Sequence, residues 1–422
     1  MNNSTSCISE KLAKLIRCQT VTVRNGNNYS AFGEIHALLP KLYPNVFATM
    51  NLEIIGGYSM VLRWSGSDKT AKPILFCAHL DVVPAGEDWT KNPFGGEIEN
   101  GKIYGSGTID MKNILACLLE SAEDLIGEGF IPKQDIYFAF GHDEEIGGFE
   151  GAGKIAQYFN ENEIKFAMVV DEGGFIGEVN RQKIARIAVA EKGILNLVLT
   201  AKDGGGHASV PPEKSALGRL SEAVSRIESN KSPLVLIDVV RDYFAVIMPD
   251  CDFENLQELS KKRDYNALLR TTAVATMMQA GHAHNVLPKI ATANINVRLM
   301  PGEKAVDYYG FVCDLISDLD VEIAMNVLRE TDKISDYKSE TFKQFCNISK
   351  EIFVDAKPVP YLMTGSTDSS FYEPLTDNIY KFCPFELEKN QFSTIHAADE
   401  YVTQKSLHGA VLFYKKLMQA KW

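Results

Sequence analysis

The sequence predicts an α/β protein with a mainly parallel sheet, into which a smaller α+β unit is inserted. The first observation is the length, because 422 residues exceed what one hydrophobic core usually supports and favour two domains. The second is the alternation of helix and strand patterns before about residue 185, which is typical of a parallel sheet. The third is a change in this order after residue 185, where two strand patterns follow one another directly.

The first part of the chain alternates short apolar runs with helical spacings. Residues 8–17 place apolar side chains at helical intervals and predict the first helix. Strands and helices are then expected in turn: strands at residues 60–64 and 74–78, a helix at 113–127, a strand at 136–140, a helix at 152–159 and a strand at 166–170. This order predicts parallel strands joined by helices.

A smaller α+β unit is predicted at residues 188–301, inserted into the larger domain formed by residues 1–187 and 302–422. Strands that follow one another and then helices, within about a hundred residues, indicate a separate unit. Its expected elements are strands at residues 185–191, 193–200, 271–279 and 291–299 and a helix at 216–229, and a last helix is expected at 404–418.

The composition excludes several classes of function. The net charge of -12 and the pI of about 5.3 argue against nucleic acid or an anionic membrane, since both require a basic surface. No apolar run resembles a signal peptide or a membrane span. The eight cysteines are scattered, without a Cys-x-x-Cys pair, as is typical of reduced thiols. We therefore expect a cytoplasmic protein without nucleic-acid or membrane partners.

Four segments carry carboxylates or imidazoles where metal ligands could converge. Three of them end a predicted strand, and the fourth leads into a predicted helix. Open α/β sheets gather functional groups at the carboxyl ends of their strands, so these segments are expected to meet. The residues are His79 and Asp81, then Asp110, then Glu144 and Glu145, and finally Asp171 and Glu172.

Imidazole and carboxylate donors without thiolates favour zinc, with cobalt or manganese as alternatives. In His79-Leu80-Asp81 the carboxylate can accept the second imidazole N–H and orient the ring. The adjacent Glu144 and Glu145 allow one carboxylate to bind metal while the other takes a proton from water. A single acidic residue after a strand is commonly a loop or cap residue, but four such segments together favour a metal-dependent hydrolase.

The motifs in which these residues stand resemble those of the M20 metallopeptidase family. The match covers nearly the whole chain in order and therefore has high specificity. Its segments are Ala78-His79-Leu80-Asp81, Gly105-Ser106-Gly107-Thr108-Ile109-Asp110, Asp143-Glu144-Glu145, Asp171-Glu172-Gly173-Gly174, Gly206-His207-Ala208, Asn285-Val286-Leu287-Pro288, Gly365-Ser366-Thr367-Asp368 and Ile395-His396-Ala397. The resemblance implies a zinc-peptidase-like catalytic domain with an inserted lid or dimerisation domain and two Zn²⁺ ions, with Co²⁺ or Mn²⁺ as alternatives.

The resemblance implies a role for each matching residue. Six residues would hold the metals: Asp110 as the bridge, His79 with one of Asp171 or Glu172 at one ion, and Glu145 with His396 at the other. The sequence leaves the choice between Asp171 and Glu172 open. Glu144 would be the general base, and Asp81 the orienting partner of His79.

The lid would supply further residues. His207 would reach an active site, often that of the partner in a homodimer formed through the lid, and polarise the scissile carbonyl. Arg298 suits a free carboxylate because its planar fork binds carboxylates in bidentate fashion, although a surface ion pair is the competing interpretation. Asn285 matches a substrate-binding position or a turn residue. Gly365 and Thr367 match pocket positions within a segment that is also common in turns.

Within the family, residues 171–176 and 191–193 most resemble the carboxypeptidase S and N-acyl-amino-acid hydrolase branch. This predicts an amidohydrolase or peptidase of N-acyl amino acids or short peptides with a free carboxylate, of the carboxypeptidase or aminoacylase type, with water activated by Glu144. A dipeptidase or tripeptide aminopeptidase is the alternative within the family. From another class, a catalytically inactive binding homologue would lack a ligand or the base, and here every expected position is filled.

Overall fold

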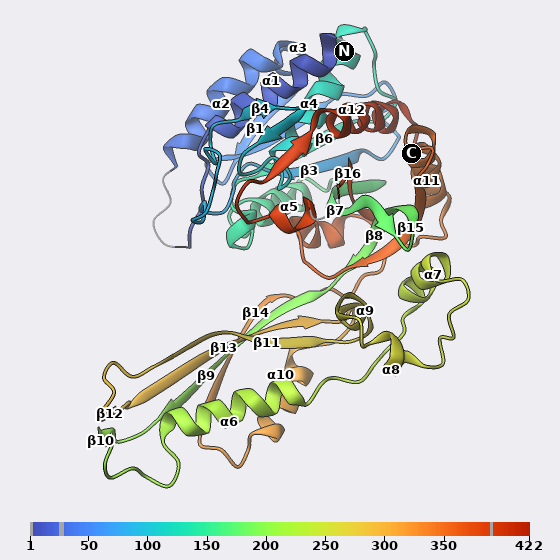
Figure 1. Cartoon of the computed structure of the whole chain (residues 1–422). Coiled ribbons are helices and arrows are strands. Elements are labelled where there is room, and N and C mark those ends of the chain that lie inside the picture. The colour runs from blue at the N-terminus through green and yellow to red at the C-terminus, as the bar shows by residue number, and fades with distance from the viewer. Residues whose placement is uncertain (1–2, 25–28, 389–390) are drawn as a thin grey trace.

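An eight-stranded sheet forms the centre of the larger of two lobes (Figure 1). The computed structural model describes residues 3–24, 29–388 and 391–422. In sheet order the strands are β1 (Asn51–Ile55), β2 (Ser59–Trp64), β6 (Ile136–Gly141), β3 (Ile74–His79), β7 (Met168–Val179), β16 (Ile379–Glu386), β8 (Gln182–Glu191) and β15 (Lys357–Met363). Strand β3 is parallel to β6 and β7, β7 is parallel to β16, and β8 is parallel to β15, whereas β1 and β2 are antiparallel. The expected α/β class with a mainly parallel sheet is confirmed.

Successive side chains of a strand point to opposite faces of the sheet, so each face contributes to a separate apolar layer. Phe76 of β3 lies in the core beneath one layer of helices, and Leu75 lies in the core on the other face. The first layer contains α1 (Asn3–Arg17), α2 (Ser30–Leu42), α3 (Pro44–Thr49), α4 (Lys112–Gly127), α11 (Glu340–Ile352) and α12 (Gln404–Gln419), and the second contains α5 (Ala152–Glu161) and the 3₁₀ segment η2 (Asp368–Leu375).

The smaller lobe is a four-stranded antiparallel sheet with helices on one face, and we call it the lid (Figure 1). In sheet order its strands are β11 (Thr272–Ala280), β13 (Ile290–Leu299), β9 (Gly193–Lys202) and β14 (Glu322–Arg329). Helices α6 (Ala216–Ser229) and α10 (Ala305–Leu315) pack on its apolar face. At its far end β10 (Gly206–His207) pairs with β12 (Val286–Leu287).

The limits of the lid differ from the expected residues 188–301. Strand β8 still belongs to the large sheet, so the lid begins with β9 at Gly193. It ends at Arg329 because β14 pairs with β9. The helix-strand order after residue 301 has the same local pattern as the large domain, and only the pairing across the sheet assigns it to the lid.

Part of the inserted segment returns to the large lobe. Helices α7 (Asp238–Ile247), α8 (Leu256–Leu259) and α9 (Arg263–Leu269) supply side chains to the core of that lobe. The ring of Tyr243 on α7, for example, lies 5.1 Å from that of Tyr361 on β15. This segment therefore packs the inserted part of the chain against the large lobe.

The remaining elements lie at the edge of the large lobe. Strands β4 (Glu97–Glu99), β5 (Lys102–Tyr104) and β17 (Tyr401–Thr403) form a small antiparallel sheet, and η1 (Glu144–Ile146) and η3 (Gln391–Thr394) are 3₁₀ turns. All eight cysteines are free thiols, as the scattered spacing predicted. Among the described residues, no helix is long and apolar enough to cross a membrane.

Candidate metal centre

The expected metal ligands come from five separate segments of the large lobe. His79 is the last residue of β3 and is 1% exposed. Glu145 lies in η1, directly after β6, and Asp110 precedes α4. Glu172 lies inside β7, which is longer than the expected strand, and His396 follows η3. Parallel neighbours β6, β3 and β7 thus bring three of these segments to one edge of the sheet.

Five of the expected ligands form two groups that share Asp110. His79, Asp110 and Glu172 make one group, and Asp110, Glu145 and His396 make the other, with the ligand atoms of each group within 4.8 Å of one another. The two oxygens of Asp110 face different histidines: Oδ1 lies 3.0 Å from His79 Nε2, and Oδ2 lies 3.1 Å from His396 Nε2. Asp110 is therefore shared by the two groups.

The structure separates Asp171 from Glu172. Adjacent residues of a strand point to opposite faces, so only one of them can face the groups around Asp110. Glu172 Oε1 lies 3.7 Å from His79 Nε2, whereas Asp171 is in neither group. Asp171 is buried. Burial raises the pKa of its carboxyl, and the nearby Lys381 offsets part of this rise. The geometry favours Glu172 as the ligand.

The chemistry of these five residues fits metal cations. Burial raises the pKa of Glu145 and of Glu172, and the neighbouring Asp110 raises both further. Hydrogen bonds to Asp110 and Glu145 raise the pKa of His396 to about 11. Burial lowers the pKa of His79, but its bonds to Asp110 and Asp81 outweigh this and raise the pKa well above its usual value. Carboxylates this close together raise one another's pKa values and those of the adjacent histidines. Such a cluster favours the binding of a cation.

One of the expected ligand atoms also lacks a hydrogen-bond partner in the described part of the chain, as does Asp171 Oδ2. Glu145 Oε1 is buried and has no hydrogen-bond partner among the described residues. A buried carboxylate oxygen without a partner is destabilising, and a cation would compensate it. The donor set of two imidazoles and three carboxylates suits zinc, cobalt or manganese.

Asp81 orients both a ligand and the neighbouring turn. Its Oδ1 lies 3.3 Å from His79 Nδ1, and its backbone oxygen lies 3.0 Å from the same nitrogen. Its carboxylate also accepts hydrogen bonds from the backbone N–H groups of Glu144 and Glu145, each at 3.2 Å. Glu144 belongs to neither ligand group. Burial raises the pKa of Glu144 well above its usual value, and Asp368 and Glu145 add to this.

Glu400 is a supporting residue to which the sequence analysis assigned no role. Its buried carboxylate accepts the backbone N–H groups of Ile109, at 2.5 Å, and Asp110, at 3.2 Å. It thereby fixes the loop that carries the proposed bridging ligand. Burial raises its pKa to about 8. The available signal was its position four residues after His396.

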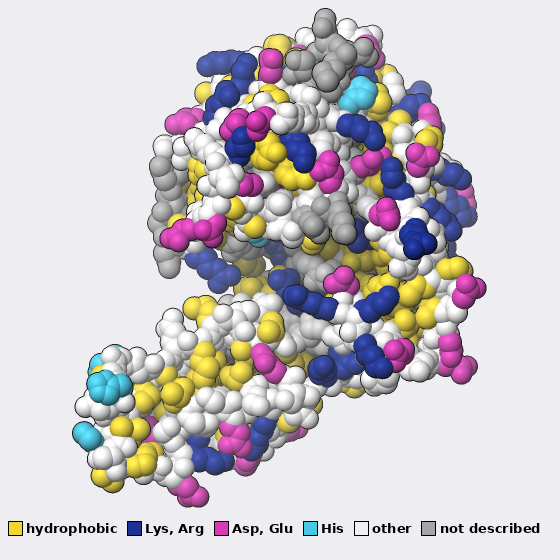
Figure 2. Space-filling model, viewed as in Figure 1, with side chains coloured by type: hydrophobic (Ala, Val, Ile, Leu, Met, Phe, Trp, Pro, Cys, Tyr) yellow, Lys and Arg dark blue, Asp and Glu magenta, His cyan; other side chains and the backbone are white. Residues whose placement is uncertain are grey.

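The lid residues fall into two places. His207 on β10 and the adjacent Asn285 are exposed at the far end of the lid, where Figure 2 shows histidine side chains gathered. His207 Nδ1 lies 2.7 Å from Ser209 Oγ. Neither His207 nor Asn285 belongs to the two ligand groups found among the described residues of the same chain. Arg298, by contrast, lies near the inner end of β13. Burial lowers its pKa, and the nearby Glu191 and Glu144 counteract this.

Gly365 and Thr367 lie after β15, at the junction of the two lobes. Gly365 is half-buried, with its nearest contact to the side chain of Met363. Thr367 is fully buried, and its N–H and hydroxyl donate to Glu191 Oε2 at 3.2 and 3.0 Å. The Thr367 side chain therefore holds a buried glutamate.

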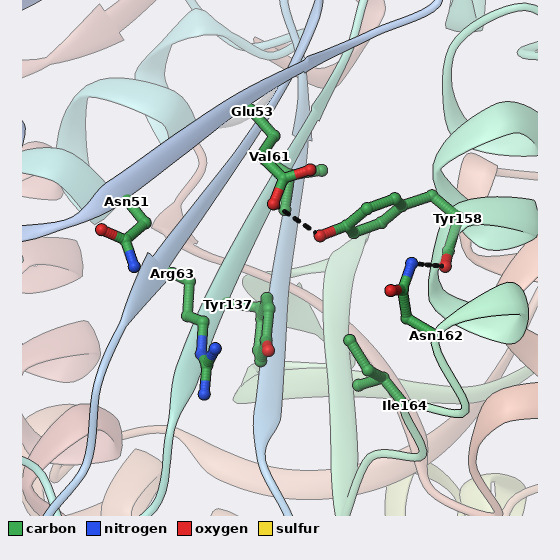
Figure 3. Close-up of a pocket in the computed structure, with 8 residues that line it drawn as sticks. All are labelled: Asn51, Glu53, Val61, Arg63, Tyr137, Tyr158, Asn162 and Ile164. Carbon is green, nitrogen blue, oxygen red and sulfur yellow. Dashed lines mark hydrogen bonds between the residues drawn. The ribbon is translucent and has the colours of Figure 1, made fainter.

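A cavity of about 440 Å³, drawn in Figure 3, contains none of these ligands in its lining. Tyr137 in its wall is near the start of β6, whereas Glu145 follows the end of that strand. Its charged groups are already paired: Arg63 bonds to Asp135, and Glu53 accepts the Tyr158 hydroxyl. Its lining residues are Asn51, Glu53, Val61, Arg63, Tyr137, Tyr158, Asn162 and Ile164, none of which was an expected site residue.

The comparison with known families agrees with this geometry. A model of the peptidase family M20/M25/M40 matches residues 75–420. The chain belongs to this peptidase family. It is 36% identical to the "Probable carboxypeptidase S-like 2" of Dictyostelium discoideum, over 98% of this chain and 84% of that protein. It is 34% identical to the "N-fatty-acyl-amino acid synthase/hydrolase PM20D1" of Xenopus tropicalis, over 97% of this chain and 85% of that protein.

Two solved structures share the fold. The M20 family metallo-carboxypeptidase Sso-CP2 from Sulfolobus solfataricus superposes with a TM-score of 0.77 at 17% identity and covers 99% of both chains. Human carnosine dipeptidase 1 superposes with a TM-score of 0.73 at 12% identity, over 98% of this chain and 96% of that one. The resemblance to M20 proteins is thus confirmed, and the chain is a metal-dependent hydrolase of this family.

Proposed function

We propose that this M20 protein uses two zinc ions to hydrolyse the amide bond of N-acyl amino acids or short peptides with a free carboxylate. The observation that carries the proposal is the pair of ligand groups that share Asp110, with Glu144 beside them and in neither group. Two metals and a separate carboxylate are what metal-assisted amide hydrolysis requires.

Each ion would be held by three residues. Asp110, His79 and Glu172 would bind one ion, and Asp110, Glu145 and His396 the other. Bound zinc supplies Lewis acidity and lowers the pKa of water. Asp81 orients His79 through the ring nitrogen that faces away from Asp110.

Glu144 would move the proton. The Asp81 carboxylate accepts a hydrogen bond from the backbone N–H of Glu144 and also contacts His79. One residue therefore positions both the base and a ligand. Glu144 takes a proton from the attacking water and returns it to the leaving amine, as a general base and then a general acid. Burial raises the pKa of Glu144, and a raised pKa strengthens the carboxylate as the base that takes the proton.

Arg298 would bind the substrate carboxylate. Its Nε donates to Asn296 Oδ1 at 3.1 Å, and no other hydrogen bond of its guanidinium is found among the described residues. The outer two nitrogens are therefore available for a bidentate carboxylate. The names of the relatives, carboxypeptidase S-like and N-fatty-acyl-amino acid synthase/hydrolase, support an N-acyl amino acid as the substrate class.

His207 would act in a partner subunit. It lies at the far end of the lid in its own chain, so a homodimer formed through the lid is the arrangement in which it could polarise a scissile carbonyl. Asn285, beside it, would reach the same partner site. The eight free cysteines support a reducing, cytoplasmic location.

Substitution of the base and a substrate panel test this function. Glu144→Gln is expected to keep its zinc and to lose hydrolysis by about 1,000-fold or more, since general-base catalysis contributes about 10²–10⁴. Cleavage of N-acetyl amino acids, which have no free amino terminus, supports the N-acyl substrate class. Cleavage of unblocked dipeptides or tripeptides alone would instead favour a dipeptidase or aminopeptidase. A zinc-loaded wild type inactive on the whole panel would favour the binding homologue.

A further inference from the structure

We propose that Arg329 is a positioning residue that locks the Glu144 turn and the Gly365–Thr367 loop to the lid. Arg329 is the last residue of β14, where the chain leaves the lid, and it pairs with Ile194 at the start of β9. It is 8% exposed although it carries a full charge. The inference rests on the proposed hydrolase function, because it concerns how the lid keeps that site in order.

A single guanidinium reaches two loops of the large lobe. One loop is the turn after η1, and the other is the start of η2, which follows Gly365. The contacts of Arg329 are Nη2 to Gly147 O at 2.9 Å, Nη2 to Asp368 Oδ1 at 3.4 Å, Nη1 to Ser370 Oγ at 2.5 Å, Nη1 to Thr367 O, and the guanidinium carbon over the Phe371 ring at 4.5 Å. The lid strand is thereby connected to the segment that carries the base and to the predicted pocket loop.

The two loops also pack directly on each other. Gly148 has a φ of 72°, and a β-carbon at this position would overlap the carboxylate of Asp368. Asp368 is buried, and Arg329 is the cation that pairs with it. Without the guanidinium, the buried carboxylate of Asp368 and the carbonyl of Gly147 would lose their donor, and such groups are strongly destabilised. The Thr367 carbonyl would lose one donor and keep the Ser370 hydroxyl. The turn that begins with Glu144 would then lose its fixed position.

Arginine is the only side chain that can make this set of contacts. Its planar fork presents donors in several fixed directions, whereas the lysine ammonium is a compact charge that cannot reach every acceptor in the same geometry. A catalytic group displaced by about 1 Å can lower a rate about 100-fold. The expected effect of losing Arg329 therefore includes a fall in kcat, because the turn held through Gly147 begins with the proposed base Glu144.

The test compares Arg329→Ala and Arg329→Lys with the matched control Arg270→Ala. Arg270 is 7% exposed, lies just before β11 at the same junction, and donates to Ser232 O at 2.9 Å, away from both loops. The measurements are kcat and KM on an N-acyl amino acid, zinc per chain, the melting temperature, and activity after addition of guanidinium at low millimolar concentration.

We expect kcat to fall about 10–100-fold in both Arg329 variants, with zinc content retained. Guanidinium is expected to restore part of the activity of Arg329→Ala and none of that of Arg270→Ala, which keeps kcat within about threefold of wild type. If Arg329→Ala does not fold, Arg329→Lys carries the test.

Two results would overturn the inference. One is kcat near wild type in the folded Arg329 variants. The other is an equal loss in the Arg329 and Arg270 variants without rescue, which would indicate a merely structural role. An inactive zinc-loaded wild type would instead refute the proposed function, so the two failures are distinguishable.

Discussion

Replacing Arg298 is expected to remove the preference for a free carboxylate. The guanidinium is partly buried, Asn296 binds its Nε, and its two outer nitrogens remain for the substrate. A hydrogen bond to a charged group contributes about 1.5–3 kcal/mol, so the loss of two should exceed about 3 kcal/mol. In Arg298→Ala, kcat/KM for an N-acyl amino acid should therefore fall at least about 100-fold. Arg298→Lys keeps the charge and should lose less.

The assay is a double-mutant cycle between enzyme and substrate. kcat/KM is measured for the N-acyl amino acid and for the same molecule with its carboxylate capped as an amide. Wild type and Arg298→Ala should differ by less than about threefold on the capped substrate, because neither can form the ion pair. Arg226→Ala, on helix α6 of the lid, is the control and should resemble wild type on both. An equal loss on capped and free substrates would refute a role in carboxylate binding.

Three further predictions concern the metals and the partner subunit. Glu172→Gln should lose about one zinc per chain by elemental analysis, since a ligand is removed, while Asp171→Asn should keep both ions. The reverse pattern would make Asp171 the ligand. Zinc binding at pH 7.5 should release protons, because the pKa of His396 in the metal-free fold, about 11, is above that pH and a histidine ligand must be neutral. Calorimetry in two buffers with different ionisation enthalpies measures this release. The affinity for zinc should fall as the pH is lowered. Mixing inactive Glu144→Gln and His207→Ala proteins should restore about a quarter of the wild-type sites, since each mixed dimer contains one site with both residues intact; no recovery after subunit exchange would contradict a shared site.

The sequence predicted the large lobe and the set of ligands because both depend on local patterns. A polar residue directly after an apolar run is at a strand end, and parallel strands bring such ends together, as for His79 and Glu145. The choice between Asp171 and Glu172 depends on how far strand β7 extends, which the sequence pattern did not show. Strand β7 continues past both residues, so alternation along the strand places one of them beside Asp110.

The lid limits and the supporting residues depend on contacts between distant segments. Strand β14 belongs to the lid only through its pairing with β9, and its local pattern does not reveal this. Arg329 contacts Gly147, which lies 182 residues earlier, and Glu400 binds the N–H of Asp110 across 290 residues. Contacts between such distant segments leave no periodicity in the sequence, so it did not reveal what Arg329 and Glu400 bind.

The most direct test of the two-metal centre is anomalous diffraction at the zinc edge from crystals of the zinc-loaded protein. Two peaks are expected, one among His79, Asp110 and Glu172 and the other among Asp110, Glu145 and His396, with an Asp110 oxygen toward each. A single peak, or two peaks that do not share Asp110, would contradict this arrangement.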